Sequence, residues 1–128
     1  MSDAAGPILV VDHDEGVRQF VGALLEDAGF RVAQAESGEK ALALASDLHP
    51  RLALVDVFLP GLSGYEVCHR LKTEFHVPVV LVSRPARESL DQLAGMLLGA
   101  DACVAKPFMP DELLDRVRQL LMSQVEAA

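Results

Sequence analysis

The sequence predicts an α/β fold built on a single doubly wound, five-stranded parallel sheet, and three observations lead to it. Five short apolar runs recur at intervals of roughly 20 to 25 residues, close to the length of one βα unit. Three of these runs are almost continuously apolar, which is typical of strands buried on both faces of a parallel sheet. Segments with helical periodicity fill the gaps, and right-handed crossovers then place helices on both faces of the sheet.

The predicted strands follow the apolar runs. In chain order they are ILVV (8–11), RVAQA (31–35), LALVD (52–56), PVVLVS (78–83) and ACVA (102–105). The connections are short and no linker interrupts the chain, so residues 1–122 are predicted to form one domain. Residues 123–128 are predicted to be a short C-terminal tail, either a frayed end or the start of a linker.

The first three helices are predicted from their caps and apolar stripes. Asp14 is a natural N-cap for the first helix, which ends at Gly29, and Ser37 caps the second. Ser63 opens the third with Glu66 three residues later, the pattern of a capping box. Their predicted core stripes are Val17, Phe20, Val21, Leu24 and Leu25; Ala41, Leu42, Ala45 and Leu48; and Val67, Leu71 and Phe75.

The last two helices are predicted at 87–100 and 110–122. The fourth closes at Gly99, and the fifth has Pro110 in its first turn, followed by two acids that suit the helix dipole. The residues expected to face the core are Leu90, Leu93, Ala94, Leu97 and Leu98 in the fourth helix and Leu113, Leu114, Val117, Leu120 and Leu121 in the fifth.

Composition narrows the function classes. Hydrophobic residues make up 51% of the 128 residues, enough for a folded core, and the net charge of -8 argues against direct nucleic-acid binding. The N-terminus lacks the pattern of a signal peptide, and no apolar stretch approaches the roughly 20 residues of a transmembrane helix. Cys68 and Cys103 have no paired spacing and are interpreted as reduced thiols. We therefore expect a soluble, cytoplasmic protein without membrane contact.

The groups that could carry chemistry follow the strands. In a doubly wound sheet, ligands bind beyond the carboxyl ends of the strands. Here the first, third, fourth and fifth strands end in, or are followed by, Asp12, His13, Asp14, Asp56, Ser83 and Lys106. Clustered carboxylates need a cation beside them, and an oxygen-rich cluster is typical of a Mg²⁺ site. A lysine and a hydroxyl could hold a phosphoryl group, which a carboxylate can itself accept as an aspartyl phosphate.

Four motifs together resemble one known family. The segments ILVVDHDEGVR, LALVDVFLPGLSGYEV, VVLVS and GADACVAKPF occur in the order and with the spacing of the receiver domain of bacterial two-component response regulators. This resemblance covers nearly the whole chain. It implies a flavodoxin-like (βα)5 fold with strand order 2-1-3-4-5 and a cis peptide bond before Pro107, which forms a tight turn.

The resemblance also implies a role for each matching residue. Asp56 is implied as the phosphoacceptor, phosphorylated by a sensor histidine kinase. Asp12, Asp56 and the backbone carbonyl of Phe58 are implied as ligands of Mg²⁺. Ser83 would hydrogen-bond a phosphoryl oxygen and couple it to the outer loops. Lys106 would pair with the phosphoryl group or, before phosphorylation, with Asp56.

One departure from the family pattern is His13, which stands where an acidic residue is usual. Imidazole is a softer ligand than carboxylate and brings no negative charge. Three interpretations remain open: Mg²⁺ binds weakly through Asp12, Asp56 and the Phe58 carbonyl; Asp14 replaces the missing acid, although its position favours helix capping; or a protonated His13 stands in for the metal. We favour weak but real Mg²⁺ binding, because the other pocket residues are retained.

The second departure is Cys103, where the family commonly carries an aromatic residue. That ring swings inward as the nearby hydroxyl, here Ser83, engages the phosphoryl group. Cys103 has no ring to swing. Signal transfer to the surface of the fourth helix, fifth strand and fifth helix is therefore predicted to differ in this chain, or to rely on loop shifts alone.

The leading hypothesis is a phosphoacceptor signalling module whose phosphorylation changes its affinity for a partner. The expected partners are a histidine kinase, a second copy joined through the surface just described, and a DNA-binding or other effector domain beyond the C-terminus. The alternative is a constitutive interaction or dimerisation module that needs no phosphate, which His13 and Cys103 favour. A small enzyme of related topology is disfavoured, because the chain has no P-loop. No enzymatic activity is expected beyond the domain's own phosphoryl transfer and dephosphorylation.

Overall fold

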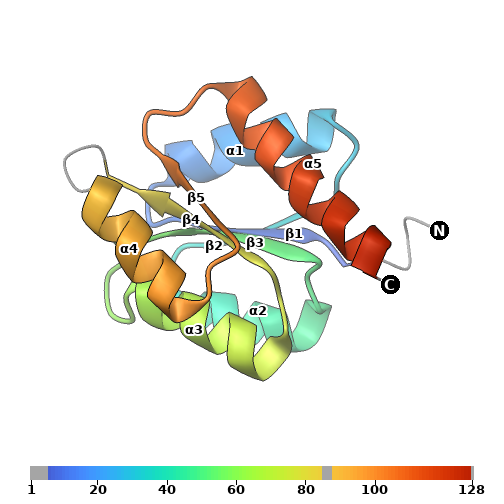
Figure 1. Ribbon diagram of the computed structural model, residues 1–128. Helices are drawn as coiled ribbons and strands as arrows, with labels where there is room; N and C mark the ends of the chain where they lie inside the picture. The colour runs from blue at the N-terminus through green and yellow to red at the C-terminus, as the bar shows by residue number, and fades with distance from the viewer. Residues whose placement is uncertain (1–5, 85–87, 128) are drawn as a thin grey trace.

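The computed structural model describes residues 6–84 and 88–127 (Figure 1). Strands and helices alternate in this part of the chain: β1 Ile8–Val11, α1 Glu15–Asp27, β2 Val32–Ala35, α2 Gly38–Leu48, β3 Leu52–Asp56, α3 Gly64–Phe75, β4 Val79–Ser83, α4 Glu88–Leu98, β5 Ala102–Ala105 and α5 Pro110–Ala127. The strands form one parallel sheet in the order β2-β1-β3-β4-β5. The predicted fold class and strand order are confirmed.

The sheet separates two apolar cores. α1 and α5 cover one face, and α2, α3 and α4 cover the other (Figure 1). Alternate residues of β1 serve both cores: Ile8 and Val10 pack with α1 and α5, whereas Leu9 and Val11 pack with α2 and α3. β1, β3 and β4 are buried along their whole length, as expected for central parallel strands. None of the helices in the described ranges combines the length and apolar character that a bilayer crossing requires.

Side chains cap the first turns of three helices, and residues in the left-handed conformation end two helices. The side chains of Asp14, Ser37 and Ser63 accept backbone hydrogen bonds in the first turns of α1, α2 and α3, which confirms the three predicted N-caps. α2 and α3 end at His49 and His76 in the left-handed conformation, with φ of 50° and 56°. Glycine or asparagine is usual at such ends, so the sequence did not mark these two.

Two predicted core residues lie at the margins of their apolar stripes and are exposed. These are Phe20 of α1 and Leu48 of α2. The sheet covers only part of each helix surface, so a residue at the margin of a wide stripe reaches solvent. The other predicted stripe residues of α1, α2, α3 and α5 are buried or half-buried. α5 continues to Ala127, beyond its predicted end.

The prediction for α4 is wrong for three of its five expected core residues, whereas Ala94 and Leu98 are half-buried. Leu90, Leu93 and Leu97 were expected to face the core, but they are 60%, 57% and 79% exposed. The helix turns Asp91 and Gly95 inward instead. A Cβ added at Gly95 would lie only 2.9 Å from a methyl carbon of Leu81 in β4, so the glycine lets the helix approach the sheet closely.

Candidate functional site

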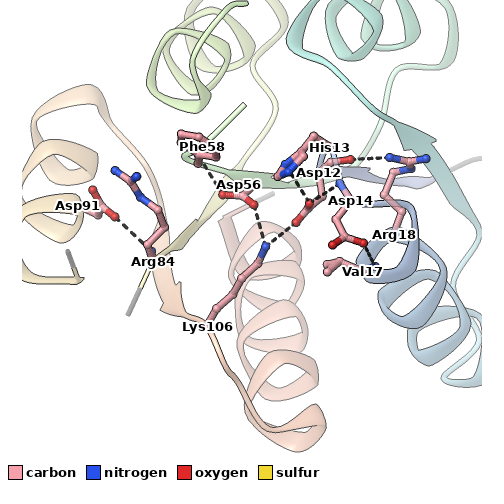
Figure 2. A network of polar contacts seen from close by, with 10 residues as sticks. All are labelled: Asp12, His13, Asp14, Val17, Arg18, Asp56, Phe58, Arg84, Asp91 and Lys106. Carbon is pink, nitrogen blue, oxygen red and sulfur yellow. Dashed lines mark hydrogen bonds and ion pairs between the residues drawn. The ribbon is translucent and has the colours of Figure 1, made fainter. Parts of the chain in front are cut away.

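Four strands bring polar residues to one edge of the sheet, and Figure 2 shows Asp12, Asp56 and Lys106 among them. Asp12 directly follows β1, Asp56 and Ser83 are the last residues of β3 and β4, and Lys106 directly follows β5. Because the strands are parallel, their carboxyl ends meet at this edge. The side chains of Asp12, Asp56 and Lys106 point toward one another, and we call these three residues the carboxylate pocket. The predicted convergence of these residues is thus confirmed.

The two carboxylates are held in the same way. One oxygen of each accepts a hydrogen bond from the backbone N–H two residues further on: Asp12 Oδ1 from Asp14 at 2.9 Å, and Asp56 Oδ1 from Phe58 at 2.9 Å. Turns of this kind fix an aspartate side chain against its own loop. Both carboxylates are buried. Each strand therefore ends in an acid whose direction is set by the loop that follows.

The loop after Asp56 is pressed against the start of α3. The Gly64 N–H donates a hydrogen bond to the carbonyl of Val57 at 3.1 Å. A Cβ at Gly64 would lie 2.1 Å from the carbonyl oxygen of Asp56, closer than any real side chain comes. Glycine at this position is what allows α3 to begin beside the end of β3.

Lys106 bridges the two carboxylates. Its Nζ lies 2.8 Å from Oδ2 of Asp12 and 2.8 Å from Oδ2 of Asp56. Burial by itself lowers the pKa of Lys106, but the hydrogen bonds to the two acids and their negative charges together outweigh it, so that pKa is raised and the lysine stays charged. The pKa of Asp56 is also raised, because burial outweighs the lowering effect of Lys106. The ammonium thus compensates for two acids that would otherwise repel each other.

The two open candidates for a third ligand occupy different places. His13 offers a ligand atom within 4.8 Å of those of Asp12 and Asp56, and its Nδ1 lies 3.8 Å from Asp12 Oδ1. Asp14 instead caps α1, with Oδ1 accepting from the Val17 N–H at 3.2 Å. The capping role that the sequence favoured for Asp14 is confirmed. His13 is the residue that lies beside the two carboxylates.

The donor set of the pocket fits a divalent cation. Each carboxylate oxygen takes part in one hydrogen bond, with a backbone N–H or with Lys106, which leaves a further lone pair on each oxygen. Oxygen donors suit Mg²⁺, whereas the imidazole of His13 suits softer metals better. The Asp12, His13 and Asp56 group could therefore hold a metal ion. Ligation by the Phe58 carbonyl stays a prediction.

Ser83 lies beside the pocket with an unused hydroxyl. Asp56 pairs with Val82 in the sheet, so Ser83 is the next residue along the neighbouring strand. Its side chain is fully buried, and its Oγ has no hydrogen-bond partner among the described residues. A buried polar group without a partner costs about 1–3 kcal/mol. An acceptor that reached this hydroxyl would therefore be bound by it.

Sequence reasoning missed a polar group next to the pocket. Asp91 of α4 is fully buried and accepts hydrogen bonds from the Tyr65 hydroxyl and from the Arg84 backbone N–H. The Arg84 guanidinium lies 5.1 Å from the ring centre of Phe58 (Figure 2). The apolar stripe predicted for α4 placed its leucines inward and therefore Asp91 outward, because acids ordinarily lie on the outer face of a helix. No local feature of the sequence marks it.

The remaining predicted positions lie at the margin of the site. The Lys106–Pro107 peptide bond is cis, as the resemblance implied. Cys103 is half-buried on β5 and lines a surface hollow of about 280 Å³ together with Met96 and Arg116. Residues of α4, β5 and α5 line this hollow. β5 is the last strand in the order of the sheet, so the hollow lies at the sheet's edge. The role of Cys103 in signal transfer stays a prediction.

Known proteins share this sequence pattern. A family model described as "Response regulator receiver domain" matches residues 8–118. The chain is 40% identical over 114 residues to the "Probable transcriptional regulator ycf27" of Cyanophora paradoxa, covering 89% of this chain and 47% of that protein. It is 39% identical over 114 residues to the "DNA-binding response regulator MtrA" of Mycolicibacterium smegmatis, covering 89% and 50%. The chain spans about half the length of these curated relatives.

A solved structure shares the fold over its full length. The chain superimposes on a putative response regulator from Chloroflexus aurantiacus with a TM-score of 0.86 and 34% identity. The alignment covers 92% of this chain and 98% of that one. The likeness therefore extends over a whole domain in both proteins.

Proposed function

This chain belongs to the family of response regulator receiver domains, and on that premise we propose that it is a phosphoacceptor module of a two-component system. Asp56 is the proposed acceptor and a sensor histidine kinase the proposed donor. The observation that carries the proposal is the carboxylate pocket, in which two buried acids share one ammonium 2.8 Å from each. A packing role alone does not require a second buried acid, since burying each one costs desolvation free energy.

The proposed reaction transfers one phosphoryl group. A carboxylate oxygen of Asp56 attacks the phosphorus of a phosphohistidine, and an O–P bond forms as the N–P bond breaks. The leaving imidazole nitrogen keeps the electron pair of the broken bond and takes up a proton. Lys106 then holds a phosphoryl oxygen instead of the free carboxylate, and the Ser83 hydroxyl donates to another.

Mg²⁺ is the proposed cofactor, with Asp12, Asp56 and the Phe58 carbonyl as its protein ligands. When bound, such a cation offsets the negative charge of the transferred group and orients its oxygens. His13 lies beside the two carboxylates but adds no negative charge. We therefore propose weaker Mg²⁺ binding than a site with a third carboxylate would give.

The proposed output is a change in partner binding. One relative is a DNA-binding response regulator, so we propose that a DNA-binding or other effector domain outside this chain receives the signal. The net charge of -8 makes the domain itself unsuited to nucleic acid. A second copy joined across α4, β5 and α5 is a further proposed partner. Beyond its own phosphoryl transfer and dephosphorylation, no enzymatic activity is proposed.

Cys68 and Cys103, both in the described part of the chain, form no disulfide. Free thiols are compatible with a cytoplasmic location, which we propose for this protein.

The alternative of a constitutive module that needs no phosphate finds no support in the relatives, which bear the names of regulators. His13 and Cys103 leave the acceptor, the lysine and the hydroxyl in place.

Incubation with acetyl phosphate and Mg²⁺, followed by mass spectrometry of the intact protein, tests the proposal. We expect the wild-type protein to gain one phosphoryl group, and we expect Asp56→Asn to abolish that gain. The matched control is Asp115→Asn, which alters an exposed acid of α5 and should leave the gain unchanged. A wild-type protein that gains nothing from acetyl phosphate or phosphoramidate, or a gain that survives in Asp56→Asn, would contradict the proposal.

A further inference from the structure

Most large side chains of α4 contribute little to fixing its orientation, because among its leucines only Leu98 is half-buried. Leu90, Leu93 and Leu97 point to solvent, while Asp91 is fully buried. Gly95 allows close approach to β4 but has no side chain to pack. The fully buried side chain on this inward face is that of Asp91, so its surroundings bear directly on the rotation of the helix.

Asp91 has two hydrogen-bond donors from two other parts of the fold. The Tyr65 hydroxyl of α3 donates to Oδ1, and the backbone N–H of Arg84, directly after β4, donates to Oδ2 at 3.3 Å. A buried carboxylate that loses its donors is strongly unfavourable, so these bonds tie α4 both to α3 and to the end of β4. Figure 2 shows the bond between Asp91 and Arg84.

Arg84 connects the hydrogen bonds of Asp91 to the carboxylate pocket. It follows Ser83, whose buried hydroxyl has no partner within the described ranges. Its guanidinium lies 5.1 Å from the ring centre of Phe58, and the Phe58 N–H bonds to Asp56 Oδ1. Arg84 is thus held at two points, by Asp91 on α4 and by Phe58 on the loop after Asp56.

We propose that Asp91 is a positioning residue that sets the resting place of the Ser83 hydroxyl and opposes its engagement with a phosphoryl group. The inference rests on the proposed function, because it assumes that Asp56 receives the phosphoryl group. The Ser83 hydroxyl has no hydrogen-bond partner among the described residues. Any movement of this hydroxyl toward a phosphoryl group on Asp56 that displaces residue 84 strains the hydrogen bond from the Arg84 N–H to Asp91. Release of the Arg84 N–H from Asp91 removes that hold and at the same time frees the rotation of α4.

Binding of beryllofluoride in the presence of Mg²⁺, measured by isothermal titration calorimetry, tests the inference. We expect Asp91→Ala to bind this phosphoryl mimic roughly three- to tenfold more tightly than the wild type, the factor that one net hydrogen bond represents. Tyr65→Phe, a milder change that removes one donor to Asp91, should shift affinity in the same direction by less. Leu93→Ala is the matched control on the same helix, because its side chain is exposed and makes no tie.

Hydrogen exchange of the α4 amides, without Mg²⁺ or beryllofluoride, gives a second measurement. We expect faster exchange over residues 88–98 in Asp91→Ala and Tyr65→Phe and no change in Leu93→Ala. If the variants bind beryllofluoride no more tightly than the wild type, or more weakly, the inference is overturned while the proposed function stands. If the wild type itself neither binds beryllofluoride nor accepts a phosphoryl group, the proposed function fails and the inference falls with it.

Discussion

Two lysines make ion pairs of equal length at opposite ends of the sheet. Lys72 Nζ lies 2.8 Å from Asp101 Oδ2, and Lys106 Nζ lies 2.8 Å from both acids of the carboxylate pocket. Asp101 precedes β5, and its Oδ2 also accepts the Val79 N–H at the start of β4. The first pair joins α3 to two strands where they begin, and the second joins the places where strands end.

The surroundings of the two pairs differ more than their distances. The side chains of Lys72 and Asp101 are each 28% exposed, so water can replace either partner. The two acids beside Lys106 are 5% and 4% exposed and have like charges. The contribution of a lysine therefore depends on how many buried charges it serves, and equal N–O distances do not reveal this.

Lys106→Met is expected to have the largest effect, because it leaves two buried carboxylates without their ammonium. We expect the free energy of unfolding, measured in urea at neutral pH without divalent cations, to fall by about 2–3 kcal/mol. This loss is smaller than for a fully buried pair because Lys106 is partly exposed. Added Mg²⁺ should restore part of this loss. A change no larger than that caused by Lys72→Met would remove the distinction between the two ends.

His13→Asp is expected to sharpen the comparison by adding a third acid to the pocket end. Mg²⁺ binding, followed by calorimetry, should become about tenfold tighter, because affinity for hard cations rises with the number of charged oxygen ligands. His69→Asp, which changes an exposed histidine of α3, is the control and should bind Mg²⁺ as the wild type does. Equal affinities of His13→Asp and wild type would place His13 outside the coordination sphere.

The raised pKa of Asp56 predicts a dependence of stability on pH. A folded-state pKa above the unfolded value of 3.8 means that this acid favours the folded state fully below pH 3.8 and loses that effect as pH rises through the folded pKa. Asp56→Asn cannot titrate, so its unfolding free energy relative to the wild type should increase as pH rises above 3.8. Urea titrations of both proteins, from acid to neutral pH and without divalent cations, measure this difference. Parallel curves would contradict the burial of an ionised Asp56.

Lys72→Met is expected to have the smallest effect. The pair is partly exposed, and Asp101 keeps its hydrogen bond to the Val79 N–H. The free energy of unfolding should fall by about 0.5 kcal/mol, and phosphorylation with acetyl phosphate should not change. Slower phosphorylation in this variant would show that the two ends of the sheet are coupled.

The pocket could be predicted from the sequence because each of its residues follows a strongly apolar run. Asp12 and Asp56 stand behind ILVV and LALV, and parallel strands bring such ends to one edge whatever the details of packing. The N-cap at Asp14 was equally local, since it depends on a side chain and its own helix turn. Properties that depend on one segment and the strand topology are therefore within reach of the sequence.

The orientation of α4 was out of reach for the same reason. Its apolar stripe is compatible with an inward or an outward face, and the buried Asp91 takes its hydrogen-bond donors from Tyr65 and Arg84, which lie outside α4. The burial of Asp91 can be understood only once those two hydrogen-bond donors are known. The predicted burial of Phe20 and Leu48 was wrong for a simpler reason. The width of the buried surface on each helix is set by the neighbouring elements, which the helix's own sequence does not reveal.

The contact between Gly64 and the carbonyl of Asp56 limits how this domain can change. The missing Cβ is the clearance between α3 and β3, so any side chain there would push the helix away from the acid and widen the loop that carries Phe58. The spacing between the start of α3 and the acceptor-bearing strand is therefore set by the backbone alone, and a substitution at Gly64 would change it.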